Sequence, residues 1–377
     1  MLTNFAALTN EQKTIWSKEV WMQARTMSFM NKFMGENNNS VIHHVTELTQ
    51  TEKGARAVLT LVADLLGDGV AGDRTLEGRE EALVSLDQVV RVDQLRHANK
   101  SRGKMAEQKS VVTFRKTSRD VLAYWLADRM TQLFMLTLAG VDYSFLCDGR
   151  LRTGIDPTNT AFSDLEFAAD VAAPSFNRRA RWNGTSKTLE FGGATSSVAA
   201  GDHVTWEMLV ELKAEAKLKH IRGVTEKGGE ESYHVFLNPT AMAGLKLDPD
   251  YMQNLRHAQA RDGSNPLFTG ATVKLDGLYI HEHEYVYNTL KAASGSKWGA
   301  GGAIDGVSVA LCGAQAVGYA DIGDASWVEK EFDFENQPAI SVGKMMGFLK
   351  PKFETIYEPG VAEDFGVINV FCAARKA

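Results

Sequence analysis

The sequence predicts an α+β fold, in which helices and strands are mixed without a repeating order. Three observations predict this class. Residues 117–140 carry apolar side chains at the spacing of a long helix. Residues 56–65 and 83–95 are typical of two strands around a polar loop. The later part of the chain mixes helix and strand signals without the strand–helix–strand repeat of a parallel α/β sheet.

The helix over residues 117–140 is the element around which we expect the rest to pack. Thr117 or Ser118 can cap its start, and Gly140 suits the residue just after its end. At ~1.5 Å per residue it is on the order of 30 Å long. Its last third is apolar nearly all round, which predicts a buried helix. The expected core positions include Leu122, Trp125, Leu126, Leu133 and Leu136.

A second helix is predicted near the N-terminus, from a Thr9–Gln12 capping box to about Phe33. It carries Trp16 and Trp21, which need an apolar partner surface. That surface belongs either to the same chain or to a neighbouring copy, and the sequence leaves both open.

A projecting hairpin is predicted next. A strand over residues 41–48 is followed by the pair 56–65 and 83–95, and the loop between that pair is rich in Gly and Asp. Such a loop is too polar for a core, so we expect it to extend from the body. The basic segment that follows, residues 97–116, is either a solvated connection or a contact for phosphate or an acidic neighbour.

Shorter elements are expected in the second half. Asp202 or Thr205 caps a helix to about residue 220, and Asn238–Pro239 and Asp248–Pro249 each begin another by the N-cap and first-turn rules. Strands are expected over residues 233–237, 277–287, 307–311 and 367–372.

Composition limits the function classes. The chain has 377 residues, 44% of them hydrophobic and 23% charged, which fits a globular protein with a large core. The net charge of −6 argues against a protein that grips nucleic acid over its whole surface. We expect Cys147, Cys312 and Cys372 to be reduced thiols of a cytoplasmic protein. We expect no signal peptide and no membrane span.

Two motifs resemble ligand sites without the required context. Gly67, Gly69 and Gly72 match the dinucleotide-binding pattern, but charged residues follow where a small-residue helix is needed. His281 and His283 lack a third metal ligand nearby, and surface histidines on an edge strand are the expectation. His43 and His44 point oppositely and make a poorer site. No catalytic, cofactor-binding or metal residue is assigned, and no cofactor is expected.

Several stretches, in order along nearly the whole chain, resemble the major capsid proteins of tailed phages, in the family typified by phage N-four. They are WSKEV (16–20), GDGVAGDRTLEGREE (67–81), YWLADR (124–129) with LAG (138–140), FLNP (236–239), NPLFTG (265–270), CGAQA (312–316), KPKFE (350–354) and DFGV (364–367). Each piece is weak alone, and none carries a catalytic residue.

The resemblance implies the Hong Kong-type capsid fold. Placed on this chain, residues 1–50 are an N-terminal arm and 51–103 an E-loop hairpin. Residues 104–200 are a P-domain with the spine helix, 201–319 an A-domain, and 320–377 the return strands of the P-domain. The charged, Gly-rich segment 222–234 departs from what the family implies.

The resemblance also implies a function: a shell subunit that forms hexamers and pentamers of the icosahedral head around the packaged double-stranded DNA. Its implied partners are copies of itself, a separate scaffolding protein, the portal, a decoration protein as an option, and DNA contacted non-specifically. It would be assembled in the host bacterial cytoplasm and reside in the virion. The rival classes are a tail-tube or other phage structural protein, and a metal- or nucleotide-dependent enzyme that uses the 67–72 or 281–284 stretch.

Overall fold

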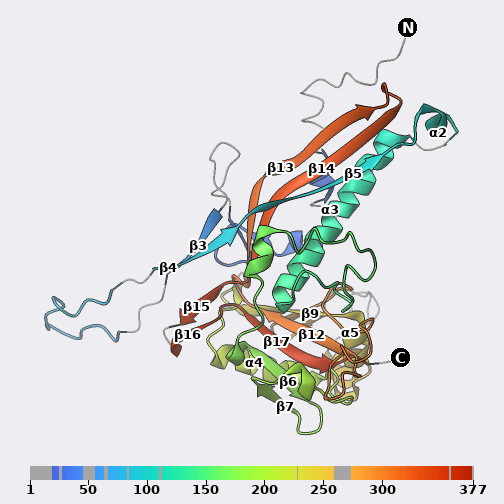
Figure 1. The fold of residues 1–377 in the computed structure, drawn as a ribbon. Coiled ribbons are helices and arrows are strands. Elements are labelled where there is room, and N and C mark those ends of the chain that lie inside the picture. The colour runs from blue at the N-terminus through green and yellow to red at the C-terminus, as the bar shows by residue number, and fades with distance from the viewer. Residues whose placement is uncertain are drawn as a thin grey trace.

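A computed structural model describes residues 19–24, 28–45, 56–62, 67–82, 85–109, 113–226, 228–258, 273–355 and 358–375. It contains two main sheets with one long helix running from the first to the second (Figure 1). The expected α+β class is confirmed, because helices and mixed sheets occur in irregular order along the chain. The Thr9–Gln12 capping box, Trp16 and the NPLFTG stretch lie outside the described residues.

The first sheet has five strands in the order β1-β2-β13-β14-β5. Its centre is a long antiparallel hairpin, β13 (Val317–Phe332) and β14 (Gln337–Leu349), which residue patterns did not reveal. On one side β2 (Ile42–Val45) joins β13 in parallel, followed by β1 (Met34–Gly35). On the other side β5 (Asp93–Lys100) pairs antiparallel with β14 and forms the edge of the sheet.

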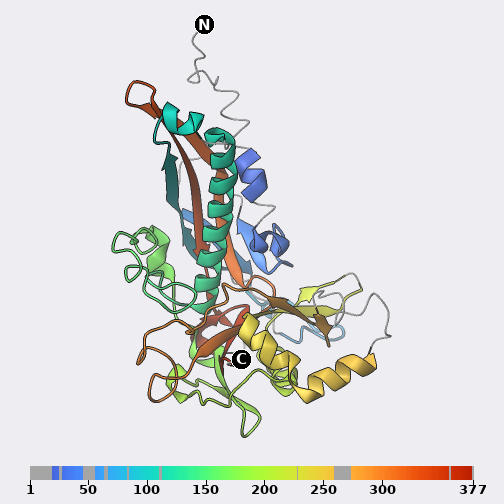
Figure 2. The same ribbon diagram turned by 90° about the vertical axis from the view of Figure 1, so that its right-hand side faces the viewer.

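The predicted long helix is α3, Phe114–Ala139, and it runs along this sheet (Figure 2). It ends as expected, because Gly140 adopts the left-handed conformation at φ 66°. Its start was predicted wrongly: Thr113, in extended conformation, precedes the first turn, so Thr117 and Ser118 lie inside the helix. The prediction of burial is confirmed, since every residue of its last third is buried.

The second sheet has eight strands, seven of them in the order β10-β11-β9-β12-β17-β6-β7, with β8 paired to β9. Its central strands are almost wholly buried. The strands are β6 (Arg179–Asn183), β7 (Thr188–Phe191), β8 (Val224–Thr225), β9 (Glu231–Leu237), β10 (Val273–Leu275), β11 (Leu278–Glu282), β12 (Gly306–Cys312) and β17 (Val367–Ala373). The segment 222–234, whose shape the resemblance left open, therefore contributes the β8–β9 pair.

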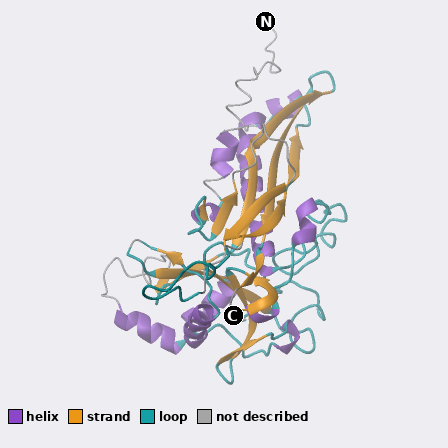
Figure 3. Cartoon of the chain, turned by 90° about the vertical axis from the view of Figure 1, so that its left-hand side faces the viewer, coloured by secondary structure: helices purple, strands orange, loops and turns teal. Residues whose placement is uncertain are grey.

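Three helices accompany the second sheet (Figure 3). They are α4 (Trp206–Leu218), α5 (Pro239–Lys246) and α6 (Pro249–Ala258). The predicted caps are confirmed for all three: the Thr205 side chain accepts from the Met208 amide, Asn238 from the Thr240 amide, and Asp248 from the Asp250 amide at 3.2 Å.

The chain passes from the second sheet into the first and back again. Strand β12 lies in the second sheet, β13 and β14 rise through the first, and β17 returns beside β12. Between them β15 (Lys352–Thr355) and β16 (Glu358–Asp364) form a short separate hairpin.

The predicted projecting hairpin is present as β3 (Arg56–Val62) paired with β4 (Ser85–Arg91). The prediction of one strand over 83–95 is wrong, because β4 ends at Arg91 and β5 begins at Asp93 in a different sheet. The expected strand over 277–287 is shorter, ending at Glu282.

The N-terminal helix does not continue to Phe33 as predicted. Residues 19–24 are helical, but Ser28 is extended, and a separate 3-10 turn, η1 (Phe29–Lys32), follows it. The remaining short elements are α2 (Lys104–Gln108) and the 3-10 turns η2 (Glu166–Asp170), η3 (Phe176–Arg178) and η4 (Thr195–Ser197).

Candidate assembly surfaces

The loop between β3 and β4 extends far from the body of the molecule (Figure 1). Over residues 67–82 every side chain is exposed except that of Val70, which is partly so. The two ends of the loop are held together where the Gly67 amide donates to the Glu81 carboxylate at 2.7 Å. Gly69 and Gly72 lie in this loop with positive φ, and no helix follows them, so the dinucleotide-binding reading fails in structure as in sequence.

The hairpin that carries this loop has two different faces. Ala57, Leu59 and Val90 are buried against the first sheet. The backbone approaches so closely that a Cβ at Gly347 would lie 2.0 Å from the Arg91 carbonyl oxygen. The opposite face leaves Val58 40% and Val89 44% exposed. An apolar outer face on a projecting arm is a surface suited to contact with another chain.

The N-terminal segment packs on its own chain at a buried lysine. Lys344 of β14 is fully buried, pairs with Asp321 and donates to the Gly323 carbonyl at an irregularity in the β13–β14 ladder. The Trp21 ring covers its ammonium at 3.8 Å from the ring centre, a cation–π contact. The apolar partner surface that Trp21 needs therefore belongs to the same chain.

Phe29 and Phe33 fix the same segment to the second sheet. Their rings contact Phe236 of β9 and His281 of β11, with centroid distances between 4.8 and 6.3 Å. Phe29 also lies 4.4 Å from His283. The segment therefore bridges both sheets, because Trp21 touches the first and the two phenylalanines touch the second.

The histidines in this cluster correct the expectation of surface histidines on an edge strand. Strand β11 pairs on both sides, and His281 shares a 2.9 Å hydrogen bond with His234. Burial lowers the pKa of His234, His281 and His283 to about 4 each, so all three are neutral at pH 7. Nothing in the sequence places His234 beside His281, since the contact depends on the parallel pairing of β9 and β11.

Among the described residues, no three or more His, Cys, Asp or Glu side chains are arranged so that they could hold a metal ion. His43 and His44 lie on β2, where His44 stacks on Tyr319 and lies 3.7 Å from Asp321. No described helix is both long and apolar enough to cross a bilayer.

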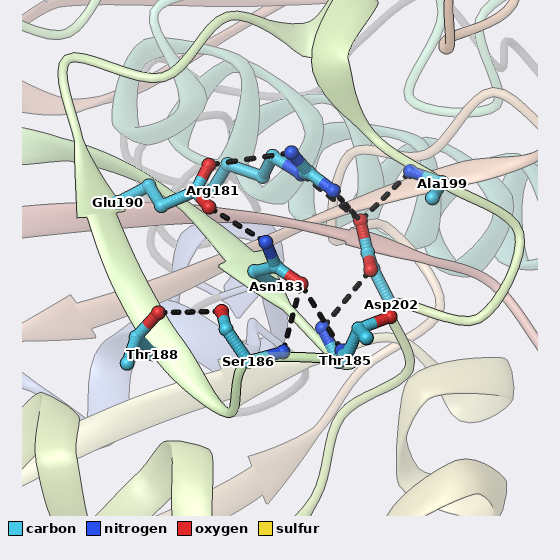
Figure 4. A network of polar contacts seen from close by, with 9 residues as sticks. Arg181, Asn183, Thr185, Ser186, Thr188, Glu190, Ala199 and Asp202 are labelled. Carbon is cyan, nitrogen blue, oxygen red and sulfur yellow. Dashed lines mark hydrogen bonds and ion pairs between the residues drawn. The ribbon is translucent and has the colours of Figure 1, made fainter.

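A polar network around Asp202 in the second sheet block has its hydrogen-bond partners within the chain. Asp202 is buried and accepts hydrogen bonds from Arg181 and from the Ala199 and Gly184 amides, at 2.7 to 3.0 Å (Figure 4). Arg181 also reaches Glu190, which in turn accepts from Asn183 at 2.7 Å. A carboxylate with all its partners within the chain holds a loop in place and is not poised for chemistry.

Two buried ion pairs tie the short β15–β16 hairpin to the rest. Arg178 lies 3.3 Å from Glu363, and Lys350 lies 3.2 Å from Asp364, with all four side chains almost inaccessible. The Ser175 amide also donates to Asp364 at 3.0 Å. These groups join the two sheets where the chain passes between them.

The three cysteines are free thiols, as expected. Cys147, Cys312 and Cys372 are free and buried, and burial raises the pKa of each thiol. They are inert core residues at neutral pH.

Part of the basic segment finds acidic partners in the same chain. Arg115 pairs with Glu329, and Arg119, just beyond the segment, lies 3.1 Å from Glu19. Other basic side chains of the segment are exposed, namely Arg102, Lys104, Lys109 and Lys116, as is Arg96 just before it.

A spine helix along a long-stranded sheet, a second mixed sheet and a projecting hairpin define a class: the shell proteins of tailed phages. Solved structures confirm this fold. The capsid of Ralstonia phage GP4 superposes with a TM-score of 0.74 at 24% identity, covering 93% of this chain and 92% of that one. The Cyanophage Pam1 capsid gives 0.69 at 17% identity, covering 93% of both.

Sequence comparison gives the particular family. A family model described as phage capsid protein matches residues 4–376. The major capsid protein of Pseudomonas phage KPP25 is 59% identical over 372 residues, which cover 99% of this chain and 98% of that protein. The chain belongs to the phage capsid protein family and is a major capsid protein. It is a structural component of a virion, and the rival enzyme and tail-tube classes are set aside.

Proposed function

We propose that this chain forms hexamers and pentamers that close into the icosahedral head of a tailed phage around its double-stranded DNA. One observation supports this: the chain has a well-packed core of its own and also extends an exposed loop, residues 67–82. The hairpin that carries this loop has an apolar outer face with Val58 and Val89 exposed. A folded monomer does not need this arm, whereas a subunit that overlaps its neighbours does.

The proposal includes the division into an arm (1–50), an E-loop (51–103), a P-domain (104–200 with 320–377) and an A-domain (201–319). Sheet membership refines it, because β6, β7 and β17 share a sheet with β9, β11 and β12. We therefore assign those three strands to the A-domain block. One chain can occupy both hexamers and pentamers if its body stays rigid while the loop at 67–82 changes its direction relative to the body.

The remaining partners in the proposal are a separate scaffolding protein, the portal, an optional decoration protein, and DNA contacted without sequence specificity. Assembly takes place in the host bacterial cytoplasm. The net charge of −6 fits a shell that does not bind its genome tightly.

Electron microscopy of the full chain tests the proposal, with the protein expressed alone and together with the scaffold gene product of its phage. Closed isometric shells with five-fold vertices are expected in at least one sample. Tubes, stacked rings or a stable monomer in both samples would overturn the proposal.

A further inference from the structure

The N-terminal segment rests on three histidines of the second sheet. The Phe33 ring lies 5.4 Å from the ring of His234 and 4.8 Å from that of His281. The Phe29 ring lies 4.4 Å from that of His283. These three histidines form the histidine cluster. Because an imidazole can take up a proton and a phenyl ring cannot, the surface beneath the two phenylalanines is one that can acquire charge.

The histidine cluster is packed as neutral rings. His234 and His281 are stacked with centroids 5.2 Å apart, and the Nδ1 of the first shares a hydrogen bond with the Nε2 of the second at 2.9 Å. Such a bond needs one nitrogen that donates and one that accepts, so it is lost when both rings are fully protonated. His283 accepts from the Tyr285 amide at 3.1 Å, and protonation removes that acceptor too. Acid therefore breaks hydrogen bonds here and places charge beneath apolar rings.

The titratable neighbours of the cluster come from η1, α3 and the second sheet; they are Lys32, Asp128, Glu226, Tyr279 and Tyr285. Lys32, on the segment itself, opposes the protonation of two histidines, whereas Asp128 and Glu226 each favour that of one. Both acids have other partners, because Asp128 accepts from the Tyr285 hydroxyl at 2.6 Å and Glu226 pairs with Lys274 at 3.1 Å. The charge of Lys32 thus adds to the repulsion between the segment and a protonated cluster.

The segment can leave the histidines without breaking a sheet. Strands β9 and β11 are joined by a parallel ladder of five residue pairs, whereas the segment meets them through its rings. The Phe33 carbonyl accepts from the Ile42 amide at 3.0 Å, and that bond belongs to the first sheet. The contact of Trp21 with Lys344 is also on the first sheet and involves none of the three histidines.

We propose that the histidine cluster is an acid-operated catch: on protonation, residues 28–33 detach from the second sheet, while that sheet stays folded and Trp21 stays on the first. At neutral pH the segment bridges the two sheets, and in acid only the first sheet holds it. The N-terminal part of the chain thereby has two positions on one folded body. This inference goes beyond the proposed shell function, because it concerns the single chain.

The size of the effect follows from proton linkage. Burial lowers the pKa of each histidine of the cluster to about 4, against an ordinary value of 6.5. A histidine that regains its ordinary pKa on release binds more protons in the released form, so acid favours release. For each such histidine, the ratio of released to docked segment rises roughly 60-fold between pH 7 and pH 4.5. Above pH 6.5 the docked form keeps its full advantage.

Hydrogen exchange with mass spectrometry on the full, unassembled chain tests the catch, with labelling times scaled for the chemical effect of pH on exchange. Between pH 7 and pH 4.5, peptides that cover residues 28–33 should lose protection at least about tenfold. Peptides that cover β9 (231–237) and residues 19–24 should keep theirs. Full protection of 28–33 at pH 4.5 would overturn the proposal. So would a simultaneous loss in β9, which would show that the whole sheet opens.

The His283→Phe variant tests whether the cluster itself drives the release. Phenylalanine keeps a ring against Phe29 but takes up no proton, so the segment should lose protection at a lower pH than in the wild type. The matched control is His97→Phe in the first sheet, where the ring stacks on Trp125, and it should release the segment at the wild-type pH. Release of His283→Phe at the wild-type pH, or an equal shift in His97→Phe, would refute the catch. Neither readout uses assembly, so the shell function is tested separately.

Discussion

At the scale of single residues, the chain separates groups that hold the fold from groups that face outwards. Charged side chains inside the body, such as Lys344 and Asp202, have their partners within the chain. Apolar side chains on the outside, such as Phe334 and Val89, are exposed to solvent in the single chain. The buried leucines of α3 were predictable because helical spacing alone orients them. The buried lysine was not, because its partners come from β13 and the N-terminal segment.

Leu126 and Leu133 provide a test of the core. Both are fully buried on α3, so replacing either by Ala should lower the free energy of unfolding by roughly 2–5 kcal/mol through lost contacts and a cavity. The matched control is Val121→Ala on the same helix, where the side chain is 53% exposed and the change should be small. Chemical denaturation of the unassembled chain measures all three. Equal stabilities would show that the helix is not buried as described.

At the scale of helices and strands, the sequence predicted the elements that are recognisable from neighbouring residues alone. The spine helix, the β3–β4 pair and the capped helices α4 and α5 follow from spacing and caps. Only the resemblance placed return strands in the region of the β13–β14 hairpin. Residue patterns did not show it, because Gly318 and Gly323 interrupt β13 and its outer half is rich in charges that resemble a loop. The aromatic and histidine cluster was missed for another reason. It combines β9, β11 and η1, whose residues meet only in the folded chain.

That cluster predicts a pH dependence. The pKa values of His234, His281 and His283 are lowered to about 4, below the ~6.5 of an unfolded chain. The unfolded state therefore binds more protons between these values, so the stability from neutral histidines is full above pH 6.5 and is lost as pH falls towards 4. Lys32 opposes the protonation of His281 and His283, whereas Asp128 favours that of His283 and Glu226 that of His234.

Thermal melts between pH 7 and pH 4 measure this loss. His281→Gln keeps a hydrogen-bonding side chain without a titrating one, and it should flatten the fall in melting temperature between pH 6.5 and 5. His220→Gln, at an exposed position, should leave the fall unchanged. If the melting temperature of His281→Gln fell with pH as steeply as that of the wild type, the histidine cluster would not control the pH dependence.

The projecting loop predicts a separation of folding from assembly. Replacing residues 67–78 by a two-residue Asn-Gly segment should leave circular dichroism and the melting temperature unchanged, because the replaced side chains are exposed, apart from that of Val70, which is partly so. It should prevent closed shells, since the shortened arm no longer reaches a neighbour. Sedimentation and electron microscopy test this second half. Normal shells from the shortened chain would show that this loop is not the intersubunit arm.

At the scale of the whole molecule, the two sheets act as one braced body. The N-terminal segment touches both, and the buried pairs Arg178–Glu363 and Lys350–Asp364 lie where the chain passes between them. The class was predictable from the order of weak sequence pieces, whereas the contact of the N-terminal segment with both sheets was not, because its partners lie far along the sequence. A rigid body with exposed extensions suits a subunit that occupies many positions in one assembly.

Such a molecule should have no small-molecule site. The glycines at 67–72 form an exposed loop, and the histidines at 281 and 283 are packed among aromatic rings. Calorimetry with NAD, ATP and zinc should show no binding tighter than ~100 µM, about −5.5 kcal/mol. A micromolar complex with any of the three would reopen the enzyme class.

The position of β17 has a consequence for synthesis. This strand fills the middle of the second sheet, between β12 and β6, yet all seven other strands of that sheet precede it in the chain. The sheet cannot close before residue 373 has left the ribosome, however early its other strands emerge. Until then the apolar edges of β12 and β6 remain open to the cell's chaperones. We therefore expect that a growing polypeptide cannot join a shell before β17 has been made.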